Sequence, residues 1–178
     1  MSDIHLPEDQ INQFKAVENA STEDIKLWIS EIEKTPLLLR NLINNIEQGQ
    51  LDKSYRLGGW TIKQIVHHIA DNNMNAYFRF KRTLTEDNPV IPSYNQDKWA
   101  ELEDYNEPIE VSLKIIESVY SRFVVLLKSL NHDDYKRLMK SETFGIMSLE
   151  TALQRFLWHD RHHMGQIQLA MMDGKGKF

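Results

Sequence analysis

Apolar residues recur at intervals of three or four positions in four long stretches of the chain. This period places them on one face of an α-helix. We therefore predict four amphipathic helices, which begin close to residues 22, 61, 108 and 149. Their apolar faces include Ile25, Ile29, Ile32, Leu39 and Ile43 in the first stretch, Ile62, Ile65, Ile69, Ala76 and Phe80 in the second, Leu113, Ile116, Tyr120, Phe123 and Leu127 in the third, and Leu149, Leu153, Phe156, Leu157 and Ile167 in the fourth.

Residues that favour the start of a helix stand before each stretch. Serine and threonine side chains accept a hydrogen bond from a free backbone N–H at the N-cap, and proline fits the first turn. The predicted starts are Ser21 or Thr22, Thr61 with Gln64 as a capping box, Pro108, and Ser148. Pro36 interrupts the first stretch, where it predicts either a kink or a break with Thr35 as the cap of a second helix.

Two irregular connections separate the later helices. Residues 85–107 contain Pro89 and Pro92 and show no sustained period, so we predict a long crossover with a short turn of helix near Trp99. Residues 131–147 are compatible with a loop or a short strand. We therefore predict an all-α fold, an antiparallel four-helix bundle with a long middle crossover. Such bundles commonly hold metals between their helices.

The length of the chain favours a single domain. It has 178 residues, and a typical domain has about 100–200. Residues 1–20 are polar and weakly periodic, and we interpret them as a loosely packed N-terminal arm. We assign residues 21–173 to one four-helix-bundle domain that binds metal, and residues 174–178 to a fraying C-terminal tail.

Composition and charge exclude several classes of function. The net charge of −5 argues against nucleic acid as a partner, and the absence of cysteine excludes disulfides, thiolate nucleophiles and cysteine-type zinc fingers. No apolar run reaches the roughly 18–20 residues that span a membrane, and the N-terminus lacks the pattern of a signal peptide. We therefore expect a cytoplasmic protein without a nucleic-acid or membrane partner, and a small molecule remains the expected partner. Any soft metal must be held by imidazole.

A pair of histidines in the last helix has the spacing of a metal site. His159 and His163 are four residues apart, so their side chains lie on one helix face at the edge of the buried stripe. Two imidazoles placed in this way can bind one Zn²⁺ or Ni²⁺ ion. An isolated pair of this kind also occurs by chance, so a third ligand is needed. His162 is directed towards the more polar side of the helix.

The second helix offers two candidates for the third ligand. His67 and His68 lie equally far from the centre of the apolar face, on opposite sides of it. Periodicity alone does not choose between them. His68 has polar neighbours, among them Asn72, and such side chains can orient an imidazole through its second nitrogen. The histidine that is not a ligand is expected to lie partly exposed on the flank of the helix.

Two segments of the chain closely resemble the YfiT branch of the DinB-like superfamily. Residues 58–71 read GGWTIKQIVHHIAD, and residues 158–167 read WHDRHHMGQI. Both motifs stand in the order and at the separation of that family. The similarity runs from about Trp28 to about Met172, and it also includes the stretches 74–77 and 79–81.

The resemblance implies a four-helix bundle that binds one divalent metal ion per chain through three histidines. Its ligands fall on His68, His159 and His163, because the family's first ligand stands eight residues after the tryptophan. Members are described as metal-dependent hydrolases, usually dimeric, with zinc or nickel; we expect Zn²⁺ first and Ni²⁺ as the alternative. Asn73 departs from the pattern, because some relatives have a further histidine there.

Three functions are compatible with such a site. A three-histidine ion with an open position can lower the pKa of bound water to about 7, which suits a hydrolase. Wider relatives resemble thiol S-transferases that use bacillithiol or a similar small thiol, whose metal-bound thiolate needs no separate base. The third alternative is a non-catalytic metal-binding module.

The catalytic acid or base is not identified by the sequence. Asp160 replaces the glutamate of a zincin motif, is one methylene shorter, and lies towards the packed side of the helix. Asp71, Glu101 and Asp104 are further candidates, although no pattern places them at the site. The basic group Arg79, Lys81 and Arg82 can meet an anionic substrate, but such groups are more often a solvated helix face, and the four tryptophans are assigned to core or interface. His5 and His132 receive no function.

Overall fold

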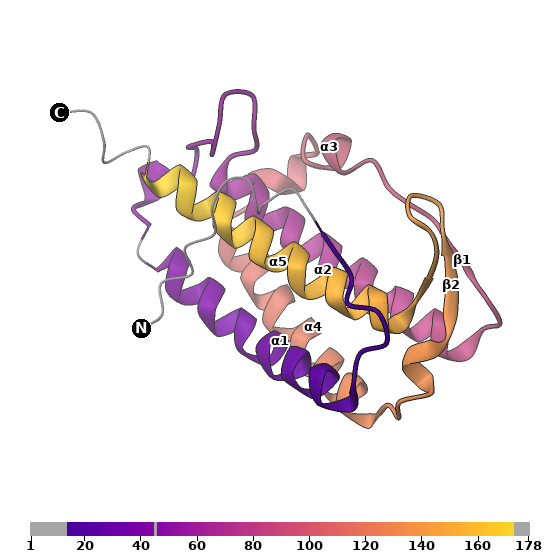
Figure 1. The fold of residues 1–178 in the computed structure, drawn as a ribbon. Helices are drawn as coiled ribbons and strands as arrows, with labels where there is room; N and C mark the ends of the chain where they lie inside the picture. Colours follow the sequence, from indigo (N-terminus) through magenta and orange to yellow (C-terminus); the bar gives the residue numbers. More distant parts are fainter. Residues whose placement is uncertain (1–13, 45, 173–178) are drawn as a thin grey trace.

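Four long helices form the body of the protein (Figure 1). A computed structural model describes residues 14–44 and 46–172. The long helices are α1 (Thr22–Ile43), α2 (Ile62–Thr85), α4 (Ile109–Ser129) and α5 (Leu149–Met172). Helices α1 and α2 each pack against both α4 and α5. The predicted helical architecture is confirmed, whereas the antiparallel arrangement of the bundle stays a prediction.

The helices begin where local side chains cap them. Ser21 and Asp24 form a capping box at the start of α1, and Thr61 and Gln64 form one at the start of α2. In α5, the Ser148 hydroxyl accepts a hydrogen bond from the backbone N–H of Thr151 at 3.1 Å. These starts are set by residues close in sequence, and the predicted caps are confirmed.

Pro36 does not end the first helix. It lies inside α1, which continues as a single helix from Thr22 to Ile43. Of the two expectations, the break with Thr35 as a cap is therefore wrong. The Thr35 hydroxyl instead donates to the backbone carbonyl of Glu31 at 3.1 Å, within the same helix.

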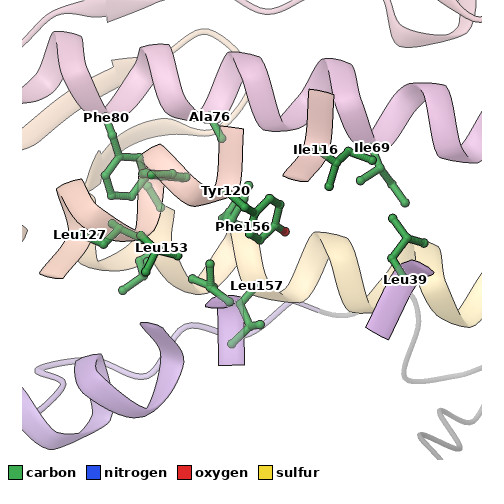
Figure 2. Close-up of a cluster of buried hydrophobic side chains, with 14 of the residues drawn as sticks. Leu39, Ile69, Ala76, Phe80, Ile116, Tyr120, Leu127, Leu153, Phe156 and Leu157 are labelled. Carbon is green, nitrogen blue, oxygen red and sulfur yellow. The ribbon is translucent and has the colours of Figure 1, made fainter. Parts of the chain in front are cut away.

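The core consists of large apolar side chains from all four long helices (Figure 2). Its centre is aromatic: Phe123 is fully buried, and its ring centroid lies 4.9 Å from that of Phe80 and 5.2 Å from that of Phe156. Tyr120 lies beside Phe156 with 5.4 Å between ring centroids, and its hydroxyl donates to the buried carboxyl of Asp160. This core fixes the relative positions of α2 and α5, which provide the candidate site.

A small three-stranded sheet lies at one end of the bundle (Figure 1). Strand β1 (Val90–Ile91) pairs in parallel with β2 (Leu138–Ser141), and β2 pairs antiparallel with β3 (Gly145–Ser148). The all-α prediction is therefore wrong in this region. Leu138–Ser141 alternates exposed and buried side chains, and Gly145 turns the chain with φ +73°. The possibility of a short strand in residues 131–147 is confirmed.

The crossover between α2 and α4 contains two short helical segments. One is α3 (Gln96–Trp99), at the position predicted for a turn of helix, and the other is the 3₁₀ helix Glu103–Asn106. Two further 3₁₀ helices, Gln48–Gln50 and Asp134–Lys136, lie in the other connections. The predicted long middle crossover is confirmed.

Part of the predicted N-terminal arm contacts α5. Residues 14–20 have no helix or strand. The backbone of Val17 hydrogen-bonds the side-chain amide of Gln154, and the N–H of Ala20 donates to Glu150 at 3.1 Å. Residues 1–13 of the arm and the tail 174–178 lie outside the described residues. Within the described part of the chain, no helix is long and apolar enough to cross a membrane.

Candidate metal centre

Three histidine side chains converge between α2 and α5. The Nε2 atom of His159 lies 3.1 Å from Nε2 of His68 and 3.1 Å from Nε2 of His163. Each residue offers a ring nitrogen within 4.8 Å of the others. Within residues 14–44 and 46–172, this is the one group of three or more histidine or carboxylate side chains arranged in this way. The structure therefore brings together the three histidines predicted as ligands.

The two helices place these rings at different depths. His68, on α2, is fully buried, and His163, on α5, is 6% exposed. His159 stands one turn before His163 on the same face of α5, and its side chain is 20% exposed. The cluster is thus closed on two sides and accessible at His159.

The spacing of the three nitrogens fits a metal ion. An ion 2.0–2.1 Å from each nitrogen in a tetrahedral shell holds two nitrogens about 3.3–3.4 Å apart. The observed 3.1 Å separations need only a small outward movement of the rings. Three histidine ligands leave the fourth position free, which is the arrangement of catalytic rather than structural zinc sites.

Burial keeps the three imidazoles neutral at pH 7. It lowers the pKa of His68 to about 3, with smaller contributions from His159 and His162. It also lowers the pKa of His159 to about 3, with smaller contributions from Arg155 and Arg79, and it holds the pKa of His163 well below its ordinary value. A neutral imidazole keeps the lone pair that a metal ligand needs. The three rings are therefore in the protonation state that a metal ligand requires.

Gln166 orients the His163 ring. The Nδ1–H of His163 donates to the Oε1 atom of Gln166 at 2.8 Å, which leaves the lone pair of Nε2 directed into the cluster. The Nε2 of Gln166 in turn donates to Nε2 of His162 at 3.0 Å, which fixes the direction of the amide. Hydrogen bonds of this kind select the tautomer of a metal ligand.

Asn72 makes the corresponding contact with His159. Its side-chain Nδ2 donates to Nδ1 of His159 at 3.1 Å, which places the ring proton on Nε2 between the other two histidines. For Nε2 of His159 to hold a metal ion, the ring proton would have to lie on Nδ1 instead. We then expect the Asn72 amide to turn and present its oxygen, because amide oxygen and nitrogen exchange places by a rotation of 180°.

Trp60 forms a wall of the cluster. Its ring centroid lies 4.5 Å from that of His68 and 6.1 Å from that of His163. Nδ1 of His68 is buried without a hydrogen-bond partner in the described residues. On the Nδ1 side, the His68 ring is therefore positioned by packing against Trp60, while its Nε2 atom contacts His159. The amide partner expected for His68 is bonded to His159 instead.

His67 lies outside the cluster and has a structural role. Its Nε2–H donates to the backbone carbonyl of Glu107 at 3.0 Å, and its Nδ1 accepts from the Ser112 hydroxyl at 2.7 Å. The residue is 5% exposed, so the expectation of a partly exposed histidine on the helix flank is wrong. The reason is that α4 packs against this side of α2 and buries it.

Across the residues that the structure describes, none of the candidate bases forms a hydrogen bond with the three histidines, and only Asp160 lies beside one of them. Asp71 accepts a hydrogen bond from the Tyr105 hydroxyl at 2.7 Å, and burial raises its pKa. Glu101 and Asp104 are exposed. Asp160 is buried, as predicted from the helix face; its Oδ1 lies 3.8 Å from Nδ1 of His159, beyond hydrogen-bond range, and burial raises its pKa to about 7.

A cavity of about 440 Å³ adjoins the cluster at His159. Its volume lies within the range of small-molecule sites. It is lined by side chains of α2 and α5, by residues 92–97 of the crossover, and by Ser141, Thr143 and Phe144 of the β2–β3 hairpin. The small sheet and the crossover thus shape an entrance to the exposed ligand.

For three residues of this site, the sequence did not predict the contact that the structure shows. Gln166 stands three residues after His163, a spacing that places both on one helix face and is visible in the sequence. Trp60 lies two residues before the start of α2, and only the packing of the structure shows that it contacts two histidines. Asn72 was considered for His68, and its contact with His159 depends on how α2 and α5 pack.

Comparison of the sequence with models of known protein families shows which family the chain belongs to. The model of the DinB superfamily matches residues 31–167, which is most of the chain. This chain belongs to the DinB superfamily. The predicted resemblance to the YfiT branch is confirmed by the similar proteins and by the solved structure described next.

Proteins similar to this DinB-superfamily chain carry names that refer to metal. A protein of Oceanobacillus iheyensis named "Putative metal-dependent hydrolase" is 46% identical over 143 residues, which cover 80% of this chain and 83% of that protein. A protein of Bacillus cereus with the same description is 43% identical over 167 residues, covering 94% and 95%. YfiT from Bacillus subtilis, described as a probable metal-dependent hydrolase with an unusual four-helix bundle topology, has a TM-score of 0.87 at 36% identity, covering 92% and 95%.

Replacement of Gln166 by leucine is expected to weaken Zn²⁺ binding by about 10–100-fold. The substitution keeps the volume of the side chain but removes the acceptor for Nδ1–H of His163. Competition with a chromogenic chelator measures the affinity. Gln154→Leu is the matched control, because Gln154 is also buried on α5 but bonds Val17 instead of a histidine. Equal Zn²⁺ affinities in the two variants would show that Gln166 does not orient the ligand.

Proposed function

We propose that this protein is a metal-dependent hydrolase of small molecules, with one divalent ion per chain held by His68, His159 and His163. The observation that carries the proposal is the convergence of three neutral imidazoles beside a cavity, with Nε2 of His159 3.1 Å from Nε2 of both His68 and His163. The names of the relatives support the same activity. We propose Zn²⁺ as the metal, with Ni²⁺ as the alternative.

The chain prepares the site for hydrolysis in several ways. When bound, a divalent ion supplies Lewis acidity, which makes water a nucleophile near neutral pH. Because all three ligands are neutral, the full charge of the ion remains available. Gln166 fixes the His163 ring, Trp60 packs on His68, and the cavity gives a substrate access to His159.

Further parts of the proposal concern the setting of the enzyme. We propose that it is a homodimer in the cytoplasm, that its four long helices are antiparallel, and that its partner is a small molecule rather than nucleic acid. The net charge of −5 supports the last point. Size-exclusion chromatography with light scattering tests the dimer.

A hydrolysis screen tests the proposed activity. Protein stripped with EDTA and reloaded with one equivalent of Zn²⁺ or Ni²⁺ is offered a panel of 4-nitrophenyl esters and anilides in the absence of thiol. We expect hydrolysis by the loaded protein that falls to background with EDTA and in His163→Ala. His132→Ala, which changes an exposed histidine away from the cluster, keeps the wild-type rate.

The same screen separates the proposal from thiol transfer. In a second arm, a chlorinated or epoxide electrophile is offered with and without a panel of small thiols. Turnover that requires both metal and thiol, with no hydrolysis of the esters or anilides, would replace the proposed hydrolase by a thiol S-transferase. Metal binding without turnover in either arm would replace it by a metal-binding module.

A further inference from the structure

The cavity beside His159 contains two arginines without an acidic partner. Arg79 of α2 and Arg155 of α5 both line it. Among the described residues, neither forms an ion pair or a hydrogen bond with a carboxylate, whereas Arg82, three residues after Arg79, pairs with Glu86. This arrangement departs from the solvated face expected for the basic group that includes Arg79.

Arg79 is largely withdrawn from solvent. Its Nε atom is buried and has no hydrogen-bond partner in the described residues. A buried donor of this kind destabilises the protein unless a ligand or water satisfies it. Burial lowers the pKa of Arg79, yet arginine stays protonated in proteins. An unsatisfied cationic donor in a cavity wall indicates an anionic ligand.

Arg155 is held in place by aromatic rings. Its guanidinium carbon lies 3.6 Å from the ring centroid of Phe144 in the β2–β3 hairpin and 4.7 Å from that of Phe14. These cation–π contacts restrain the guanidinium group but do not use its N–H donors. A fixed, planar set of donors suits bidentate recognition of a carboxylate or a phosphate.

The two charges act on the same volume as the candidate metal ligand. Burial lowers the pKa of Arg155, and the nearby positive charge of Arg79 lowers it further. Burial also lowers the pKa of His159, and the charges of both arginines add to that shift. The one carboxylate in the cavity lining, Asp97, is exposed on α3. The cavity is therefore positive, although the whole chain has a net charge of −5. Its remaining walls include the apolar rings of Phe80, Phe156 and Trp158.

We propose that this cavity binds the anionic group of the substrate, a carboxylate or a phosphate ester, between Arg79 and Arg155. The apolar part of the substrate packs against Phe80 and Phe156, and its reacting end reaches towards His159. The inference rests on the proposed function for the reacting end, whereas anion binding by the arginines is independent of the metal.

Titration with matched anionic and neutral compounds tests the proposal. The anionic probes are 4-phenylbutyrate and phenyl phosphate, and 4-phenylbutanamide is the neutral counterpart. Isothermal titration calorimetry measures the binding of each probe to metal-stripped and to Zn²⁺-loaded protein. In both forms we expect each anion to bind at least tenfold more tightly than the amide. Arg79→Gln and Arg155→Gln should each reduce anion affinity at least tenfold and leave amide binding and zinc content unchanged.

Control variants and the wild type decide the outcome. Arg82→Gln, which removes an exposed arginine paired with Glu86, should bind both anions as the wild type does. Equal affinity of the wild type for the amide and the anions would overturn the proposal, whether or not the variants fold. Anion binding that requires zinc and survives both arginine substitutions would overturn it too, because the metal would then be the anion site. Arginine-dependent anion binding in a protein that binds no zinc would support the anion site and contradict the proposed hydrolase.

Discussion

His68→Ala, His159→Ala and His163→Ala are each expected to abolish stoichiometric binding of Zn²⁺. The three Nε2 atoms form one cluster, so each substitution leaves only two nitrogen ligands. His68 and His163 are buried, so no exposed side chain can take the vacant place without a rearrangement of α2 and α5. Metal content after dialysis, measured by plasma mass spectrometry, gives the result directly: one equivalent in the wild type and about none in the variants.

Two neighbouring histidines provide matched controls. His67→Ala should retain one equivalent of Zn²⁺, because His67 is bonded to Ser112 and the backbone of Glu107 rather than to the cluster. His162→Ala should also retain it, because His162 is not one of the three ligands: its side chain bonds Gln166, and its ring packs edge-on against that of His163. Loss of the metal from either control, or its retention in a ligand variant that is folded by circular dichroism, would show that the ligand set is wrong.

Phe123→Ala is expected to lower the free energy of unfolding by about 3–5 kcal/mol. Phe123 is fully buried at the centre of the bundle, and its ring contacts Tyr77 and Phe80 of α2 and Phe156 of α5. The truncation leaves a cavity that surrounding helices fill only partly. Urea unfolding of the metal-free protein measures the change.

A second substitution on the same helix controls for local effects. Val125→Ala on α4 changes a side chain that is 69% exposed, so we expect a change of less than about 0.5 kcal/mol. A loss for Phe123→Ala no larger than that for Val125→Ala would contradict the described core. Retention of zinc binding by Phe123→Ala under folding conditions would show that the core supports the site without forming part of it.

The sequence predicts those features of the fold that depend on residues close together in the chain. The partners in the capping boxes, Ser21 with Asp24 and Thr61 with Gln64, are only three positions apart, so they are visible in the chain. The sheet could not be predicted in the same way. Its pairing joins Val90 to Lys140, fifty residues apart, and each strand has only two to four residues, too few for a clear alternation.

In the candidate site, too, local spacing is predictable from the sequence and long-range packing is not. The spacing of His159 and His163 predicts one shared helix face, but the period of α2 leaves His67 and His68 equivalent. The family resemblance selected His68. In the structure, His67 is hydrogen-bonded to Ser112 of α4, whereas His68 contacts His159 of α5. Long-range packing, which no local pattern contains, thus separates the two.

The cavity shows the same dependence on long-range packing. In the chain, Arg79 belongs to a basic group with Lys81 and Arg82 and has the pattern of a solvated helix face. In the structure, residues 92–97 and the β2–β3 hairpin line the same cavity as Arg79. These segments come from two connections that have no helical period, and for this reason the sequence pattern does not show the enclosure.

Anomalous diffraction at the zinc edge, on crystals grown with one equivalent of Zn²⁺, tests the three-histidine centre most directly. We predict a single strong peak per chain, about 2.0–2.1 Å from Nε2 of His68, His159 and His163, with Nδ1 of His163 bonded to Gln166. A peak that lacks any of these three ligands, or one that lies at His67 or elsewhere in the protein, would contradict the account.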